Sequence, residues 1–74
     1  MKTLYLKIKG TEEQALRHAE KHGVEASVSG YTYDEETDAH ETTLRIKRGS
    51  VKAARRWAAY ADDNFPVGTV VKGY

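Results

Sequence analysis

The chain contains no cysteine, one proline, and one each of tryptophan, phenylalanine and methionine among its 74 residues. The absence of cysteine excludes disulfide bonds and thiolate metal ligands, and it fits a reducing compartment such as the cytoplasm. No apolar run approaches the roughly 20 residues that cross a bilayer, so we expect no membrane association. Glycine-rich phosphate-binding motifs are also missing. These absences predict one small cytoplasmic domain over residues 1–74.

The charged residues are nearly balanced in number but not in position. The net charge is +1, from 12 basic and 11 acidic side chains, which argues against a strongly electrostatic nucleic-acid binder. An acidic run holds five of these carboxylates within eight positions: Asp34, Glu35, Glu36, Asp38 and Glu41. The remaining residues carry 12 basic and 6 acidic side chains, a formal charge of +6. We therefore expect a basic body with one acidic protrusion, although a plain solvated loop has the same pattern.

Apolar periodicity predicts a strand and then a helix in the first part of the chain. Residues 3–9 alternate between apolar and polar side chains, as a half-buried strand does. Residues 11–23 are predicted to be helical, because Thr11 and Gln14 have capping-box spacing and Gly23 suits the position after the last turn. The apolar stripe of this helix consists of Ala15, Leu16 and Ala19.

Residues 24–48 predict a hairpin with an acidic tip. The outgoing strand places Val24, Ala26 and Val28 on one face and Ser27, Ser29, Tyr31 and Tyr33 on the other. Gly30 within this run indicates a bulge. The return strand places Thr42, Leu44 and Ile46 inward and Thr43, Arg45 and Lys47 outward.

A second helix is predicted to begin after Ser50, its N-cap, and to end before Pro66. Its apolar face follows helical spacing and contains Ala54, Trp57, Ala58, Ala61 and Phe65. We expect Trp57 and Phe65 to be core anchors. Residues 67–74 predict a short last strand.

The predicted element order is β-α-β-β-α-β. Because β-α-β crossovers are right-handed, both helices fall on the same face of the sheet. The expected fold class is α+β: a ferredoxin-like sandwich with a four-stranded antiparallel sheet in the order 4-1-3-2 and two helices on one face. The opposite face of the sheet is expected to be open to solvent.

The sequence offers no convincing catalytic or metal-binding pattern. His18 and His22 have the four-residue spacing of a shared metal site, but no third ligand is evident. Two exposed histidines near a helix C-terminus, where the dipole favours positive charge, are the better explanation of the pair. His40 lies in "HETTL", which lacks the second histidine of a zinc protease motif. No activated nucleophile or tuned acid–base pair is indicated. We therefore expect neither an enzyme nor a cofactor.

The open face of the predicted sheet combines tyrosines with basic side chains. It is expected to present Tyr5, Lys7, Lys9, Ser29, Tyr31, Tyr33, Thr43, Arg45 and Lys47. Such a platform can stack bases and neutralise phosphates. The same residue types also cover many open sheet faces because of their β propensity and long amphipathic stems.

One segment of this face resembles a known motif. "LYLKIK" (residues 4–9) is similar to the first-strand motif of RNA-recognition-motif domains, which share the β-α-β-β-α-β order, and Tyr5 stands at its aromatic position. The resemblance implies stacking of single-stranded RNA on the open face. It does not extend to the third predicted strand, where "TTLRIKRG" (residues 42–49) has no aromatic residue in place of the two that the family carries.

The second predicted helix carries its charges against the helix dipole. Cations crowd its beginning, and Asp62 and Asp63 stand near its end, whereas the reverse order is stabilising. The basic cluster consists of Lys47, Arg48, Lys52, Arg55 and Arg56. At a helix N-terminus this cluster suits a phosphate or a carboxylate-rich protein surface. If the helix is exposed, solvent screening makes the energetic cost of this charge order small.

Two functional hypotheses follow. The first is a non-enzymatic protein-interaction module whose partner carries an acidic patch. In size and lack of motifs the chain resembles small accessory proteins of phages and mobile elements, such as anti-CRISPR proteins, which implies an inhibitor that occludes a surface of a larger host complex. The alternative is a nucleic-acid-binding module that uses the open sheet face and the basic start of the second helix.

Both hypotheses use the same predicted contact residues: Tyr5, Lys7, Tyr31, Tyr33, Arg45, Lys47, Arg48, Lys52, Arg55 and Arg56. The acidic hairpin residues Asp34, Glu35, Glu36 and Asp38 form a second candidate surface. The chain is expected to be a monomer or a homodimer joined through edge strands.

Overall fold

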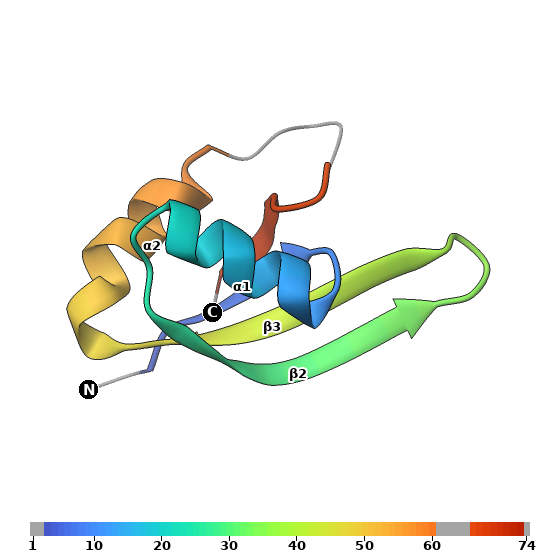
Figure 1. The fold of residues 1–74 in the computed structure, drawn as a ribbon, viewed down its shortest axis with the longest axis horizontal. Coiled ribbons are helices and arrows are strands. Elements are labelled where there is room, and N and C mark those ends of the chain that lie inside the picture. Colours follow the sequence, from blue (N-terminus) through green and yellow to red (C-terminus); the bar gives the residue numbers. More distant parts are fainter. Residues whose placement is uncertain (1–2, 61–65, 74) are drawn as a thin grey trace.

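The computed structural model describes residues 3–60 and 66–73. The elements in chain order are β1 (Tyr5–Lys9), α1 (Glu12–Lys21), β2 (Ala26–Asp34), β3 (Ala39–Ile46), a 3-10 turn (Arg48–Ser50), α2 (Val51–Ala58) and β4 (Val70–Gly73). Both helices lie on one side of the sheet, and the β2–β3 hairpin extends well beyond them (Figure 1). None of the described helices is long and apolar enough to cross a bilayer.

The four strands form one antiparallel sheet in the order β2-β3-β1-β4. β1 and β3 are central, and β2 and β4 are the edges. Read from the β4 edge, this order is 4-1-3-2. The predicted α+β class, with an open four-stranded antiparallel sheet and two helices, is confirmed.

The core lies between the sheet and the helices. Its buried apolar residues are Leu6, Ile8, Ala15, Ala19, Val24, Leu44, Ile46, Ala54, Trp57 and Val70. The strands supply mostly branched side chains, whereas the helices supply small alanines and one tryptophan. The Trp57 indole N–H donates to the Gly68 carbonyl oxygen at 3.1 Å, which satisfies the polar group of a buried indole. Trp57 is a core anchor as predicted, and Phe65 lies outside the described residues.

The predicted ends of α1 are confirmed. The Thr11 hydroxyl accepts from the Gln14 backbone N–H at 3.3 Å, and the Gln14 side chain accepts from the Thr11 backbone N–H at 2.9 Å. Gly23 follows the helix with φ +72°, a left-handed conformation that glycine adopts without steric cost. Ala15 and Ala19 are buried, but Leu16 is exposed. Its assignment to the apolar stripe is therefore wrong.

The second helix has its predicted N-cap residue but ends earlier than predicted. Ser50 occupies the N-cap position, but its hydroxyl makes no bond within its own helix. α2 ends at Ala58, whereas the apolar spacing predicts a helix that continues to Pro66. The predicted helix residues Ala61, Asp62, Asp63 and Phe65 lie outside the described residues. The last strand is also shorter than predicted, because β4 begins only at Val70.

β2 contains the bulge that Gly30 predicts. The register with β3 shifts between Val28 and Gly30, so that Ser29 is an extra residue with no opposite residue on β3. Side chains on a strand alternate between the two faces. Beyond the extra residue, each side chain therefore lies on the face opposite to the one that unbroken alternation assigns.

The tyrosines beyond this bulge lie on the helix-bearing face of the sheet. Tyr31 is opposite Thr42, and Tyr33 is opposite His40. By alternation along β3, these two partners point to the same face as the buried Leu44. The prediction that Tyr31 and Tyr33 share the open face with the basic side chains is therefore wrong.

Candidate partner-binding surface

The sheet face away from the helices carries a row of basic side chains. The central strands present Tyr5, Lys7, Lys9, Glu41, Thr43 and Arg45 on it. Strand pairing places Tyr5 opposite Arg45. Lys7 lies between Thr43 of β3 and Lys72 of β4. The structure therefore brings the predicted contact residues Tyr5, Lys7 and Arg45 together on this open face.

Ion pairs neutralise only part of this positive charge. Lys7 pairs with Glu41 at 3.1 Å, and their side chains are 30% and 26% exposed. Lys47 pairs with Glu25 at 3.6 Å, but both of these side chains are largely exposed, so water screens the interaction. Arg45 and Arg48 form no ion pair within residues 3–60 and 66–73. Both guanidinium groups therefore carry positive charge that no carboxylate of the described residues neutralises.

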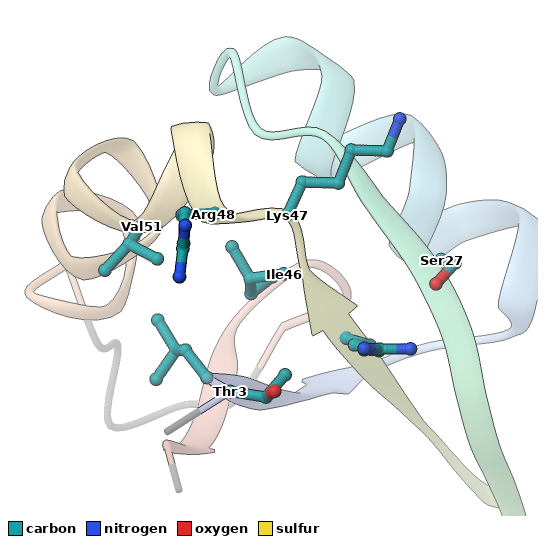
Figure 2. Close-up of a pocket in the computed structure, with 8 residues that line it drawn as sticks. Thr3, Ser27, Ile46, Lys47, Arg48 and Val51 are labelled. Atoms are coloured by element: carbon teal, nitrogen blue, oxygen red, sulfur yellow. The ribbon is translucent and has the colours of Figure 1, made fainter. Parts of the chain in front are cut away.

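A groove lies at the end of the open face where β3 leads into α2. Its volume is about 430 Å³, and its lining consists of Thr3, Leu4, Ser27, Arg45, Ile46, Lys47, Arg48 and Val51. Figure 2 shows Arg48 and Val51 on one side of the groove and Thr3 below, with Ile46 between them. Lys47 extends away from Arg48 toward β2 (Figure 2), in keeping with its ion pair to Glu25. The lining of the groove therefore combines apolar side chains with hydroxyl and guanidinium groups.

The predicted basic cluster spans both ends of α2, and only part of it reaches the groove. Lys47 and Arg48 precede α2, and Lys52 lies in its first turn. Arg55 and Arg56 lie in the last turn of this eight-residue helix, where the dipole favours positive charge. Their predicted position at the helix beginning is therefore wrong, and only Arg48 and Lys47 of the cluster line the groove.

The acidic hairpin projects from the opposite end of the molecule. The tip of the β2–β3 hairpin lies at the end of the long axis away from α2 (Figure 1). At the tip, the Asp34 carboxylate accepts from the Glu36 backbone N–H at 3.0 Å. Asp38 has a positive φ of 54°. The predicted acidic protrusion is thus separated from the basic groove by the length of the sheet.

His18 and His22, at the C-terminal end of α1, each interact with neighbouring residues of the fold. The His22 ring stacks on Trp57 with 5.1 Å between ring centroids. Burial, followed by the positive charges of Lys21, His22 and Arg17, lowers the pKa of His18 from its ordinary value of 6.5. Among the described residues, no three histidine or carboxylate side chains gather as a metal-binding group.

Comparison of the chain with protein-family models, with curated proteins and with solved structures gives no match. The open face, the groove and the hairpin are therefore interpreted from their own geometry and charge.

Several groove residues have no signal in the sequence. Thr3, Leu4, Ser27 and Val51 come from three separate segments and match no motif. Strand pairing brings the first two of these segments together, and packing of α2 against the core adds Val51. Lys72 joins the open face because β4 has a register shift opposite Lys7 and Ile8, and a pattern within one short strand does not reveal such a shift.

Proposed function

We propose that the chain is a non-enzymatic protein-binding module of ferredoxin-like architecture, whose open sheet face and adjoining groove bind an acidic surface of a larger protein. The observation that carries this proposal is the pair of uncompensated guanidinium groups, Arg45 and Arg48, on the groove lining. Arginine pairs with carboxylates through two parallel hydrogen bonds, which gives both charge and direction to the contact.

The mixed chemistry of the groove supports a protein partner. Leu4 and Val51, which are partly exposed, offer apolar contacts beside the arginines. A carboxylate that is carried on a protein surface brings apolar groups with it, so both kinds of contact are used at once. Tyrosine and arginine are also enriched among the residues that dominate binding energy at protein interfaces, and Tyr5 lies directly opposite Arg45.

The proposed action is occlusion of a partner's surface. A chain of 74 residues covers a standard-sized interface with one face of its sheet. This fits an inhibitor from a phage or mobile element that blocks a host defence or nucleic-acid-processing complex in the cytoplasm, in the manner of anti-CRISPR proteins.

Capture from a cytosolic lysate with the immobilised chain, followed by mass spectrometry, tests the proposal. The expected result is a stoichiometric partner at about 0.15 M salt, and its loss by at least tenfold in the double variant Arg45→Glu/Arg48→Glu. The matched control is Arg17→Glu, which reverses the charge of an exposed arginine on α1, in the helix layer. Equal recovery of the partner by the parent and the double variant would refute the proposed surface.

A nucleic-acid-binding module is the second candidate, and the pairing of Tyr5 with Arg45 beside Lys7 favours it. One tyrosine and several cations on central strands can stack a base and contact phosphates. Binding of a fluorescent single-stranded oligonucleotide distinguishes this candidate, because phosphate contacts make affinity fall steeply with salt. If the oligonucleotide does not bind even at about 0.02 M salt, this candidate is excluded.

A further inference from the structure

Three rings gather on the helix-bearing face of the projecting hairpin. Tyr33 and His40 have ring centroids 4.6 Å apart, and the Tyr31 ring centroid lies 5.9 Å from the same imidazole. Two hydrogen bonds hold the tyrosines in place. The Tyr31 hydroxyl bonds to His40 Nδ1, and the Tyr33 hydroxyl donates to Asp38 Oδ1 at 2.6 Å.

The described helices do not cover this ring cluster. The outer part of the β2–β3 hairpin, residues 31–41, extends past α1 (Figure 1). Tyr31 and Tyr33 are 41% and 47% exposed. Because hydrogen bonds already restrict the rings, a partner that binds them loses little side-chain entropy. The cluster therefore has the preorganised aromatic character of an interface contact.

The charge around the rings selects the partner. No lysine or arginine occurs between Lys21 and Arg45, and the tip of the hairpin carries the four carboxylates Asp34, Glu35, Glu36 and Asp38. Asp38 is bonded directly to a ring of the cluster. Aromatic faces beside carboxylates attract cationic side chains, above all the planar guanidinium group.

We infer that residues 31–41 form a second docking surface, which binds a protein segment rich in arginine. Tyr31, Tyr33 and His40 provide the stacking contacts, and the carboxylates at the tip provide the charge. This surface goes beyond the proposed function and does not depend on it, because it lies on the other face of the sheet and attracts the opposite charge. The chain then has two contact surfaces, one for an acidic partner and one for a basic partner.

Titration of the ¹⁵N-labelled chain with a hexa-arginine peptide, followed by NMR chemical shifts, tests the inference. The expected result is a saturable change that is confined to residues 31–41. Hexa-lysine of equal charge is expected to bind at least threefold more weakly, since an ammonium group does not stack as a guanidinium does. The exposed carboxylates Glu12 and Glu20 of α1 lie outside the ring cluster and serve as the internal control.

Two variants separate ring contacts from charge. Tyr33→Ala is expected to weaken hexa-arginine binding at least fivefold, and Tyr60→Ala, which removes an exposed tyrosine beside α2, is expected to leave it unchanged. Tyr33→Phe keeps the ring without the bond to Asp38 and is expected to retain most of the affinity. If Tyr33→Ala disturbs the hairpin, its amide spectrum shows this, and the difference in affinity between hexa-arginine and hexa-lysine for the Tyr33→Phe variant still separates ring contacts from charge.

Three outcomes would overturn the inference. Hexa-arginine fails to shift residues 31–41, or it shifts Glu12 and Glu20 equally, or hexa-lysine binds as tightly and Tyr33→Ala changes nothing. A dilution series of the free chain tests a different occupant. If the resonances of residues 31–41 move with protein concentration, a second copy of this chain covers the cluster, and an arginine-rich partner is not its occupant.

Discussion

The Ser50 hydroxyl accepts a hydrogen bond from the backbone N–H of Glu25 at 2.8 Å. This bond joins the start of α2 to the segment that leads from α1 into β2. The Lys47 backbone N–H donates to the Glu25 carbonyl oxygen at 3.0 Å in the same place. Because its oxygen serves another segment, Ser50 occupies an N-cap position without capping its own helix.

Replacement of Ser50 by alanine is expected to lower the free energy of unfolding by about 1–3 kcal/mol, because the Glu25 N–H loses its acceptor at a site where Ser50 is only 7% exposed. Urea denaturation measures the loss, and hydrogen exchange of the Glu25 amide should become faster. The control Ser27→Ala, at an exposed position, is expected to change stability by less than about 0.5 kcal/mol. Equal stabilities of the two variants would contradict this role of Ser50.

Two single-residue deletions in β2 test the bulge. Deletion of Ser29 removes the extra residue and leaves Tyr31 opposite Thr42, so the nuclear Overhauser contacts between Tyr31 and His40 should persist. Deletion of Thr32 also removes one residue. It allows the strand to pair without a bulge only if Tyr31 turns to the open face, so the contacts with His40 should disappear. If both variants keep the contacts between Tyr31 and His40, or both lose them, the bulge at Ser29 does not set the register of β2 against β3.

Gly68→Ala is expected to destabilise the fold by roughly 1–3 kcal/mol. Gly68 has φ +93°, and a methyl group there would lie 2.4 Å from His18 Nδ1. The matched variant is Gly23→Ala, since Gly23 has φ +72° but no atom within 4 Å of the added carbon. Thermal unfolding of both variants separates backbone strain from the clash. The double variant His18→Ala/Gly68→Ala should regain only the stability that the clash costs. If the stability losses of the two single variants simply add, the methyl group at residue 68 does not clash with His18.

Stability is expected to fall as the pH drops below about 6.5, in part because of His18. Its folded-state pKa is lowered, first by burial and then by Lys21, His22 and Arg17. The unfolded chain therefore takes up a proton first, and stability rises with pH between the folded and unfolded pKa values. Below the folded pKa the contribution of His18 stays constant. An NMR titration that places the His18 pKa at or above 6.5 would contradict this, and His18→Gln should flatten the pH dependence of urea denaturation.

The second helix shows where prediction from local spacing ends. Ala54, Trp57 and Ala58 follow helical periodicity, and the buried position of Trp57 confirms that part. The same spacing continues to Ala61, but α2 ends at Ala58. Periodicity reports which face of a helix is apolar, and it does not report where the helix stops when the stop signal lies several residues away. The shorter helix is the reason that Arg55 and Arg56 obey the dipole rule.

The tyrosines of β2 show a different limit. Gly30 indicates a bulge, but the faces of Tyr31 and Tyr33 depend on which residue is extra. The pairing with β3 makes that residue Ser29. Alternation counted along one strand therefore assigns the wrong face to every residue beyond the bulge. Both tyrosines lie in the ring cluster around His40 and not on the predicted basic face.

Features that depend on neighbouring residues could be predicted from the sequence alone. The capping box of Thr11 and Gln14, the glycine that ends α1 and the alternation of Leu4, Leu6 and Ile8 depend on contacts a few residues apart, and they establish the α+β class. Three other features became evident only from the folded chain: the groove around Arg45 and Arg48, the partner of Ser50 and the face of Tyr33. Each of these depends on the register between segments that are distant in sequence, which packing of the whole core selects.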